Sequence, residues 1–166
     1  MKLIGIAFVL FSAGSVGFRI SKGLGGQCRL ARQILHALQV LRNEIACCCT
    51  PLPQAFALLA VASDGALESI FSRVAREMDR QRWLTPEQAM ISALEETSLG
   101  PFDSVLRSLC VKLGKYDVQA QIQGIEMAKE QVEEILHTLE AEQNLKSKTY
   151  KTLGICAGLA LVILLI

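Results

Sequence analysis

Apolar residues in the central part of the chain recur with helical spacing. Between residues 27 and 49 they stand three or four positions apart, which is the pattern of a helix with one apolar stripe. The members of this stripe are Leu30, Ile34, Leu38, Leu41 and Ile45. No stretch shows the strict alternation of apolar and polar residues that is typical of a β-strand. The pattern therefore predicts an all-α fold.

Two further helices are predicted after this one. The segment Thr50-Pro51-Leu52-Pro53 interrupts the first helix, and we expect Thr50 to cap the next helix, with Pro51 at its first position. The inward-facing residues of this second helix are expected to be Ala55, Leu58, Leu59 and Ala62. Asp64 is expected to cap a third helix, which has an apolar face and an outer row of arginines. The apolar face comprises Leu67, Phe71, Val74 and Met78, and the outer row comprises Arg73, Arg76 and Arg80.

The segment Thr85-Pro86-Glu87-Gln88 predicts the start of a fourth helix. A threonine with a glutamine three residues later forms a capping box, in which each side chain accepts a hydrogen bond from the other residue's backbone N–H. This helix should end near Thr97, and Gly100-Pro101 separates it from a fifth helix that stops at Gly114. The apolar face of the fifth helix comprises Phe102, Val105, Leu106, Leu109 and Leu113.

A sixth, longer helix is predicted from Asp117 to Thr149. It contains no proline, and at about 1.5 Å per residue it would be roughly 50 Å long. Its apolar face comprises Ile122, Ile125, Val132, Ile135, Leu136 and Leu139. We expect that it can continue without a break into the apolar end of the chain.

The two ends of the chain are apolar. Residues 3–18 contain only Ser12 and Ser15 as polar residues, and residues 150–166 end in an uninterrupted apolar run. Each is a candidate transmembrane helix, although a cleaved signal peptide is the alternative for residues 3–18. Basic residues flank both runs on their central sides, which keeps the centre in the cytoplasm by the positive-inside rule. We predict a hairpin with both termini outside the cytoplasm and residues 19–149 folded as a six-helix bundle within it.

Small residues within these runs are candidates for membrane helix packing. Gly154 and Gly158 form a GxxxG pair, and Ala13 and Gly17 form a weaker pair of the same spacing. Such pairs let helix backbones approach closely, but they are also frequent by chance in apolar helices. Packing of the two segments, association with another subunit, and no role all stay open.

Composition limits the function classes. A net charge of +1 over 166 residues provides no electrostatic case for nucleic-acid binding. Three of the six cysteines form the triplet Cys47-Cys48-Cys49, without the spacing of a metal site. In a reducing compartment they are expected to be small apolar fillers, with a redox or metal role as the alternative.

Nothing in the sequence has the spacing of a catalytic set. The two histidines, His36 and His137, are both placed on predicted amphipathic helices, with no nucleophile or carboxylate at a recognised spacing. The chain also lacks phosphate-loop, metalloprotease and serine-hydrolase motifs. We expect no catalytic residue, no cofactor and no metal, which disfavours an enzyme.

The candidates for partner binding are Arg73, Arg76, Arg80 and Trp83. The arginine row is either a solvated face or a docking surface for an acidic partner or lipid headgroups. Trp83 lies in the loop before the fourth helix, where it either anchors an interface or packs onto the core.

Several segments together resemble the stage III sporulation protein AB family. They are Glu44-Ile45, the segment Thr50-Pro51-Leu52-Pro53-Gln54-Ala55, the segment Leu113-Gly114-Lys115-Tyr116-Asp117 with Gln121, and the terminal run from Leu153-Gly154. The resemblance covers nearly the whole chain. It departs from the family pattern at Cys47-Cys48-Cys49, where larger or polar residues are expected.

This resemblance implies a six-helix domain like that of the type II secretion inner-membrane platform protein. It also implies a non-enzymatic component of the channel between mother cell and forespore, in the mother cell membrane that faces the forespore. The implied partners are a secretion-type ATPase of the same operon and channel ring proteins, with oligomerisation open. The alternative function is a small membrane-anchored thiol redox enzyme or sensor that uses Cys47, Cys48 and Cys49.

Overall fold

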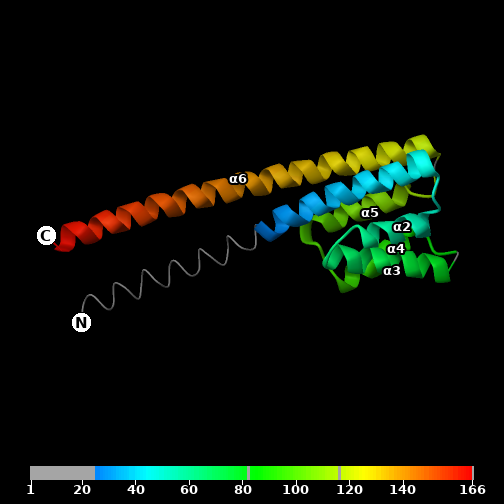
Figure 1. The fold of residues 1–166 in the computed structure, drawn as a ribbon, viewed down its shortest axis with the longest axis horizontal. Coiled ribbons are helices and arrows are strands. Elements are labelled where there is room, and N and C mark those ends of the chain that lie inside the picture. Colours follow the sequence, from blue (N-terminus) through cyan, green and yellow to red (C-terminus); the bar gives the residue numbers. More distant parts are fainter. Residues whose placement is uncertain (1–24, 82, 116, 166) are drawn as a thin grey trace. The chain divides into compact units, whose positions relative to one another are not determined.

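The computed structural model describes residues 25–81, 83–115 and 117–165, and from residue 146 onward it describes the backbone only. These residues form six α-helices and no strand, so the predicted all-α fold and the number of helices are confirmed. The helices are residues 25–43, α2 (Leu52–Val61), α3 (Ala66–Arg80), α4 (Pro86–Glu96), α5 (Asp103–Lys112) and α6 (Val118–Leu165) (Figure 1). A π-helical turn, η1 (Glu44–Cys48), ends the first helix, and a 3-10 turn, η2 (Gly100–Phe102), precedes α5.

The chain divides into two compact units, and the larger one is Ala31–Ile135. Within it α2 packs on α3, α3 on α4, and α4 on α5. The first helix lies antiparallel to the start of α6, because Arg42 Nε lies 2.7 Å from Glu126 Oε1 and Lys129 Nζ donates to Gln39 Oε1 at 3.2 Å. Residues 31 and 135 therefore lie at the same end of this unit.

One apolar core joins the helices of the larger unit. The fully buried side chains come from the first helix and from α2 to α6, so each element presents an apolar face to the same interior. The stripes predicted for the third and fifth helices are confirmed, since every residue assigned to them is buried. These residues are Leu67, Phe71, Val74, Met78, Phe102, Val105, Leu106, Leu109 and Leu113.

The face predicted for the second helix is partly wrong. α2 buries Ala55, Phe56, Leu59 and Ala60, whereas Leu58 is 46% exposed and Ala62 is also exposed. The helix is apolar on several sides, with Val61 on its outer surface as well. Spacing alone cannot select the buried face of such a helix, because more than one apolar stripe is available.

Two of the predicted helix caps are wrong. The Thr50 hydroxyl donates to Glu44 Oε2 at 2.6 Å, and the N-cap position of α2 is occupied by Pro51 without a side-chain cap. A hydroxyl–carboxylate hydrogen bond is charge-assisted and competes successfully with capping. At α3 the N-cap is Gly65, whose φ of +63° suits glycine, and Asp64 makes no capping hydrogen bond.

The other two predicted helix starts are confirmed. At α4 the backbone N–H of Gln88 donates to Thr85 Oγ1, and the backbone N–H of Thr85 donates to Gln88 Oε1, both at 3.3 Å. At α6 the Asp117 carboxylate accepts a hydrogen bond of 3.2 Å from the backbone N–H of Ala120. Both helix ends thus satisfy backbone donors that have no partner within the helix.

The cysteine triplet does not fill the core. Cys47, Cys48 and Cys49 are all exposed, so the prediction that they are apolar fillers is wrong. The reason is the π-helical turn η1, after which Cys49 adopts a left-handed conformation with a φ of 49°. The backbone N–H groups of Cys49 and Thr50 both donate to the Glu44 carbonyl, which closes the helix end.

The second unit combines Met1–Leu30 with Leu136–Ile166. Within its described part, the Cys28 thiol donates to Gln143 Oε1 at 3.8 Å. The final helix runs without interruption from Val118 to Leu165, as predicted. Among the residues that the structure describes, none forms a helix that is both long and apolar enough to cross a membrane. The predicted anchor at residues 3–18 lies outside the described residues, and both anchors stay predictions.

Candidate partner-docking surface on helices α2 and α3

α3 has one buried and one open face. Its buried face holds six apolar residues against the core, so the opposite face is directed outward. Glu68, Ser72, Arg76 and Arg80 follow one another at intervals of four residues, which places them in one row along that outer face. Because the buried face fixes the helix, the outer row is held in a defined position.

Arg73 is tied into contacts between α3 and α4. Its Nε lies 2.8 Å from Glu77 Oε1, it forms a second ion pair with Glu96, and its Nη2 donates to Ser92 Oγ at 3.4 Å. Its side chain is 30% exposed. These contacts hold two helices together, and we therefore leave Arg73 out of the docking surface.

Arg76 and Arg80 are directed into solvent. Both are exposed, and the only hydrogen bond of the Arg76 side chain within the described residues is 3.2 Å from its Nε to the Ser72 carbonyl. In the part of the chain that the structure describes, no carboxylate is paired with either guanidinium, including that of the nearby Asp79. Both guanidinium groups are free to bind a carboxylate or phosphate in a bidentate manner.

Trp83 stands just beyond the end of α3 and is 76% exposed. Its ring is therefore not packed onto the core, and its role as an interface anchor stays a prediction. Tryptophan and arginine are the residues most enriched among those that dominate binding energy at protein interfaces. Arg76, Arg80 and Trp83 are thus exposed side chains of the types that anchor partners.

A groove adjoins this row between α2 and α3. It has a volume of about 270 Å³ and is lined by Ala57, Ala60, Val61, Glu68, Ser72, Ala75 and Arg76. Val61 is 87% exposed at its rim. Sequence reasoning missed this groove, because it lies between two helices and the periodicity of each helix does not show how the two pack together. The spacing of four residues between Glu68, Ser72 and Arg76 was the signal in the sequence that these side chains share one side of α3.

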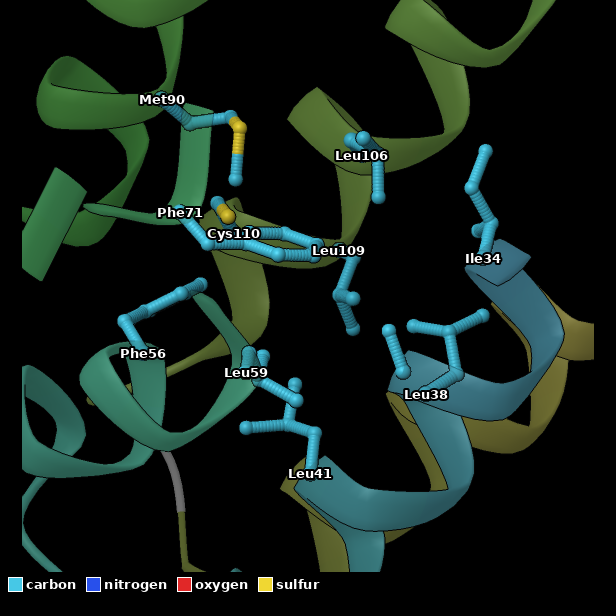
Figure 2. Close-up of a pocket in the computed structure, with 11 residues that line it drawn as sticks. Ile34, Leu38, Leu41, Phe56, Leu59, Phe71, Met90, Leu106, Leu109 and Cys110 are labelled. Carbon is cyan, nitrogen blue, oxygen red and sulfur yellow. The ribbon is translucent and has the colours of Figure 1, made fainter. Parts of the chain in front are cut away.

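The interior of the bundle contains a small cavity that is not a ligand site. Figure 2 shows its walls, formed by apolar side chains from the first helix and from α2 to α5. Its volume of about 10 Å³ is at the lower limit for one water molecule, and it has no polar lining to bind one. Such a space is a packing defect in the core.

The remaining titratable candidates do not converge on one site. His36 and His137 are both exposed on their helices. Burial raises the pKa of the Cys110 thiol from 9.0 to about 12, with a smaller contribution from Glu87, so this cysteine stays protonated at neutral pH. Among the described residues, no group of three or more His, Cys, Asp or Glu side chains is arranged to hold a metal ion.

The candidates for membrane helix packing are not tested. Ala13 and Gly17 lie outside the described residues. Gly154 and Gly158 belong to α6, in the part for which only the backbone is described.

Two segments that carry the family resemblance meet in space. Gly114 has a φ of +77°, and a Cβ atom there would lie 3.1 Å from Leu52 Cδ1 and 3.8 Å from Pro86 Cγ. The glycine that ends α5 is thus in close contact with the Leu-Pro start of α2 and with the first residue of α4. Lys115 Nζ lies 3.3 Å from Glu87 Oε2 at the same end of the larger unit. These segments bring together the end of α5 and the starts of α2 and α4.

Comparison with known proteins assigns the chain to a family. The family model for stage III sporulation protein AB matches residues 2–166. The stage III sporulation protein AB of Bacillus subtilis (strain 168) is 29% identical over 172 residues, with 99% of each chain covered. A solved structure of a stage III sporulation protein AB has a TM-score of 0.54 and 24% identity, covers 74% of this chain and 94% of its own, and supports the fold. The chain belongs to the stage III sporulation protein AB family.

Proposed function

We propose that this protein is a non-enzymatic membrane platform of the channel between mother cell and forespore. In this proposal the terminal helices anchor it in the mother cell membrane that faces the forespore, with the bundle in the cytoplasm. The bundle binds a secretion-type ATPase of the same operon and positions it beneath the channel ring proteins. The mechanism is positional, and no residue performs chemistry.

The observation that carries this proposal is the exposed surface of Arg76, Arg80 and Trp83. Arg76 and Arg80 project from α3, which is fixed by six buried residues and by the ion pairs of Arg73, and Trp83 lies in the loop that follows. A helix that is fixed in this way and presents unpaired guanidinium groups suits recognition of an acidic surface. It provides such a surface with little loss of conformational freedom on binding.

The test is affinity purification of the tagged full-length protein from sporulating cells in detergent, followed by mass spectrometry. We expect a secretion-type ATPase or channel ring proteins to co-purify, and an unrelated tagged membrane protein serves as control. Recovery of intact protein in the membrane fraction with neither partner would contradict the proposal.

The second candidate function is a membrane-anchored thiol redox enzyme or sensor. It is favoured by one observation, the exposure of Cys47, Cys48 and Cys49 at the end of the first helix. Exposed thiols are accessible to oxidants, whereas the buried Cys110 is not. Replacement of all three exposed cysteines by alanine separates the two functions, because a platform retains spore formation and a thiol enzyme loses it.

A further inference from the structure

We propose that the groove between α2 and α3 binds an amphipathic helix of a partner protein whose charges are segregated along its length. The acidic half of that helix lies over Arg76 and Arg80, and a basic residue lies over Glu68. The inference rests on the proposed function, since it specifies how the platform recognises its partner.

The floor of the groove suits a helix. Ala57, Ala60 and Ala75 are small, so the backbone of a docked helix can approach closely. Val61 is 87% exposed at the rim of the groove and provides apolar area for a docked helix. The volume of about 270 Å³ lies just below the roughly 300–1,000 Å³ of small-molecule pockets. A row of apolar side chains from a helix fits this space better than an enclosed ligand does.

The charges along the groove change sign from one end to the other. Glu68, Ser72 and Arg76 line the groove in this order, and Arg80 follows about one turn further along α3. At about 1.5 Å per residue, Glu68 and Arg80 are roughly 18 Å apart along the helix. Within the described residues none of these three charged side chains has an ion-pair partner. The same charge pattern also stabilises α3 through its helix dipole, since acidic residues are favourable near the start of a helix and basic ones near its end. The dipole does not account for the open groove beside these residues.

A second copy of this chain in the same direction does not fit the groove. Two copies side by side in that direction would place Glu68 over Glu68 and Arg76 over Arg76, which is repulsive. Two copies in opposite directions would match the charges, and light scattering distinguishes that pair from binding of a partner helix.

The test uses two synthetic helical peptides with the same composition, net charge and apolar face. One has its acidic and basic residues segregated into two halves, and in the other they alternate. Binding to the full-length protein in lipid nanodiscs is measured by fluorescence anisotropy, with empty nanodiscs as background. Two or three surface ion pairs predict about tenfold tighter binding of the segregated peptide.

The double variant Arg76→Glu/Arg80→Glu makes the row uniformly acidic and should abolish the preference for the segregated peptide. Arg107→Glu, an exposed position on α5, is the matched control and should retain it. Equal binding of the two peptides to the wild-type protein, or no binding of either, overturns the inference. A dimer seen by light scattering in detergent and lost in the double variant also overturns it, because the occupant is then a second copy.

The peptide experiment is independent of the proposed function. If the wild-type protein co-purifies with the ATPase but shows no peptide preference, only the groove inference fails. If the peptide preference is present and no ATPase co-purifies, the proposed function fails and the groove serves a different helical partner.

Discussion

Cys49 alone among the described non-glycine residues has a positive φ, of 49°. A side chain in the left-handed region raises the energy of the folded state by about 1–2 kcal/mol. This conformation ends the first helix and turns the chain toward α2. It also explains why the cysteine triplet lies on the surface, where its thiols do not contribute to the core.

Cys49→Gly should therefore stabilise the protein. Removal of the strain outweighs the greater flexibility of glycine in the unfolded chain, with a net gain of about 0.5–1 kcal/mol and a rise in Tm of roughly 1–4 °C. Circular dichroism during heating of the protein in detergent measures this change in Tm. Cys48→Gly is the control, because Cys48 lies within η1 and glycine there should lower Tm. A fall in Tm for Cys49→Gly would show that the left-handed residue stores no strain.

The buried thiol of Cys110 predicts a pH dependence of stability. Its pKa rises from 9.0 to about 12 on folding, so the unfolded chain loses this proton at lower pH than the folded protein does. The free energy of unfolding should fall with pH by up to about 1.4 kcal/mol per pH unit between roughly pH 9 and pH 12, and this contribution should be constant below pH 9. Denaturant unfolding at several pH values measures the slope. The Cys110→Ala variant should show a shallower fall, and identical slopes would exclude this thiol as the cause.

Single residues were the least predictable level from sequence. Arg73 has the same spacing and charge as its neighbours in the predicted row, yet it pairs with Glu96, 23 residues later, which local pattern cannot reveal. The exposure of Trp83 and the bond from Thr50 to Glu44 likewise depend on where other elements lie. The sequence pattern identified the row of arginines. Only the folded structure shows that Arg73 joins two helices whereas Arg76 and Arg80 are exposed.

At the scale of elements, the contact between α5, α2 and α4 at Gly114 joins the segments that carry the family resemblance. Gly65, Gly100 and Gly114 all have positive φ, between 63° and 77°. A Cβ atom at Gly114 would crowd Leu52, whereas one at Gly65 or Gly100 would meet nothing within 4 Å. Substitution at Gly65 or Gly100 therefore introduces backbone strain alone, whereas substitution at Gly114 introduces backbone strain and a close contact.

Gly114→Ala should destabilise the protein more than Gly100→Ala does. Both substitutions introduce left-handed strain of about 1–2 kcal/mol, and Gly114→Ala additionally displaces the Leu52 side chain, for a difference of about 1 kcal/mol. Chemical denaturation of both variants in detergent measures the difference. Equal loss of stability would show that α2 accommodates the added methyl group freely.

The elements predicted well have one clear apolar face or one strong capping signal. α3 and α5 each bury the residues assigned to them, and the capping box of α4 forms as expected. The position of α2 along the chain was predicted correctly, but its buried face was partly wrong, because apolar residues lie on several sides of this helix. The groove could not be predicted either, because it is formed by residues of both α2 and α3.

At the scale of the whole molecule, the exposed residues Arg76, Arg80 and Trp83 belong to a helical bundle that lies in the sequence between two predicted membrane anchors. Sequence predicted the fold class, the order of the helices and the family. It could not define the docking surface, which combines residues of α2 with residues of α3 that only the packed structure brings together.

The most direct test of this account is quantitative recovery of the secretion-type ATPase by tagged variants from sporulating cells. Arg76→Glu/Arg80→Glu should reduce co-purification at least about tenfold, since two favourable charge contacts become repulsive. The amount of protein in the membrane fraction and its helical content should not change, and Arg107→Glu should behave as the wild type. Unchanged recovery with the double variant would contradict the claim that this face of α3 receives the ATPase.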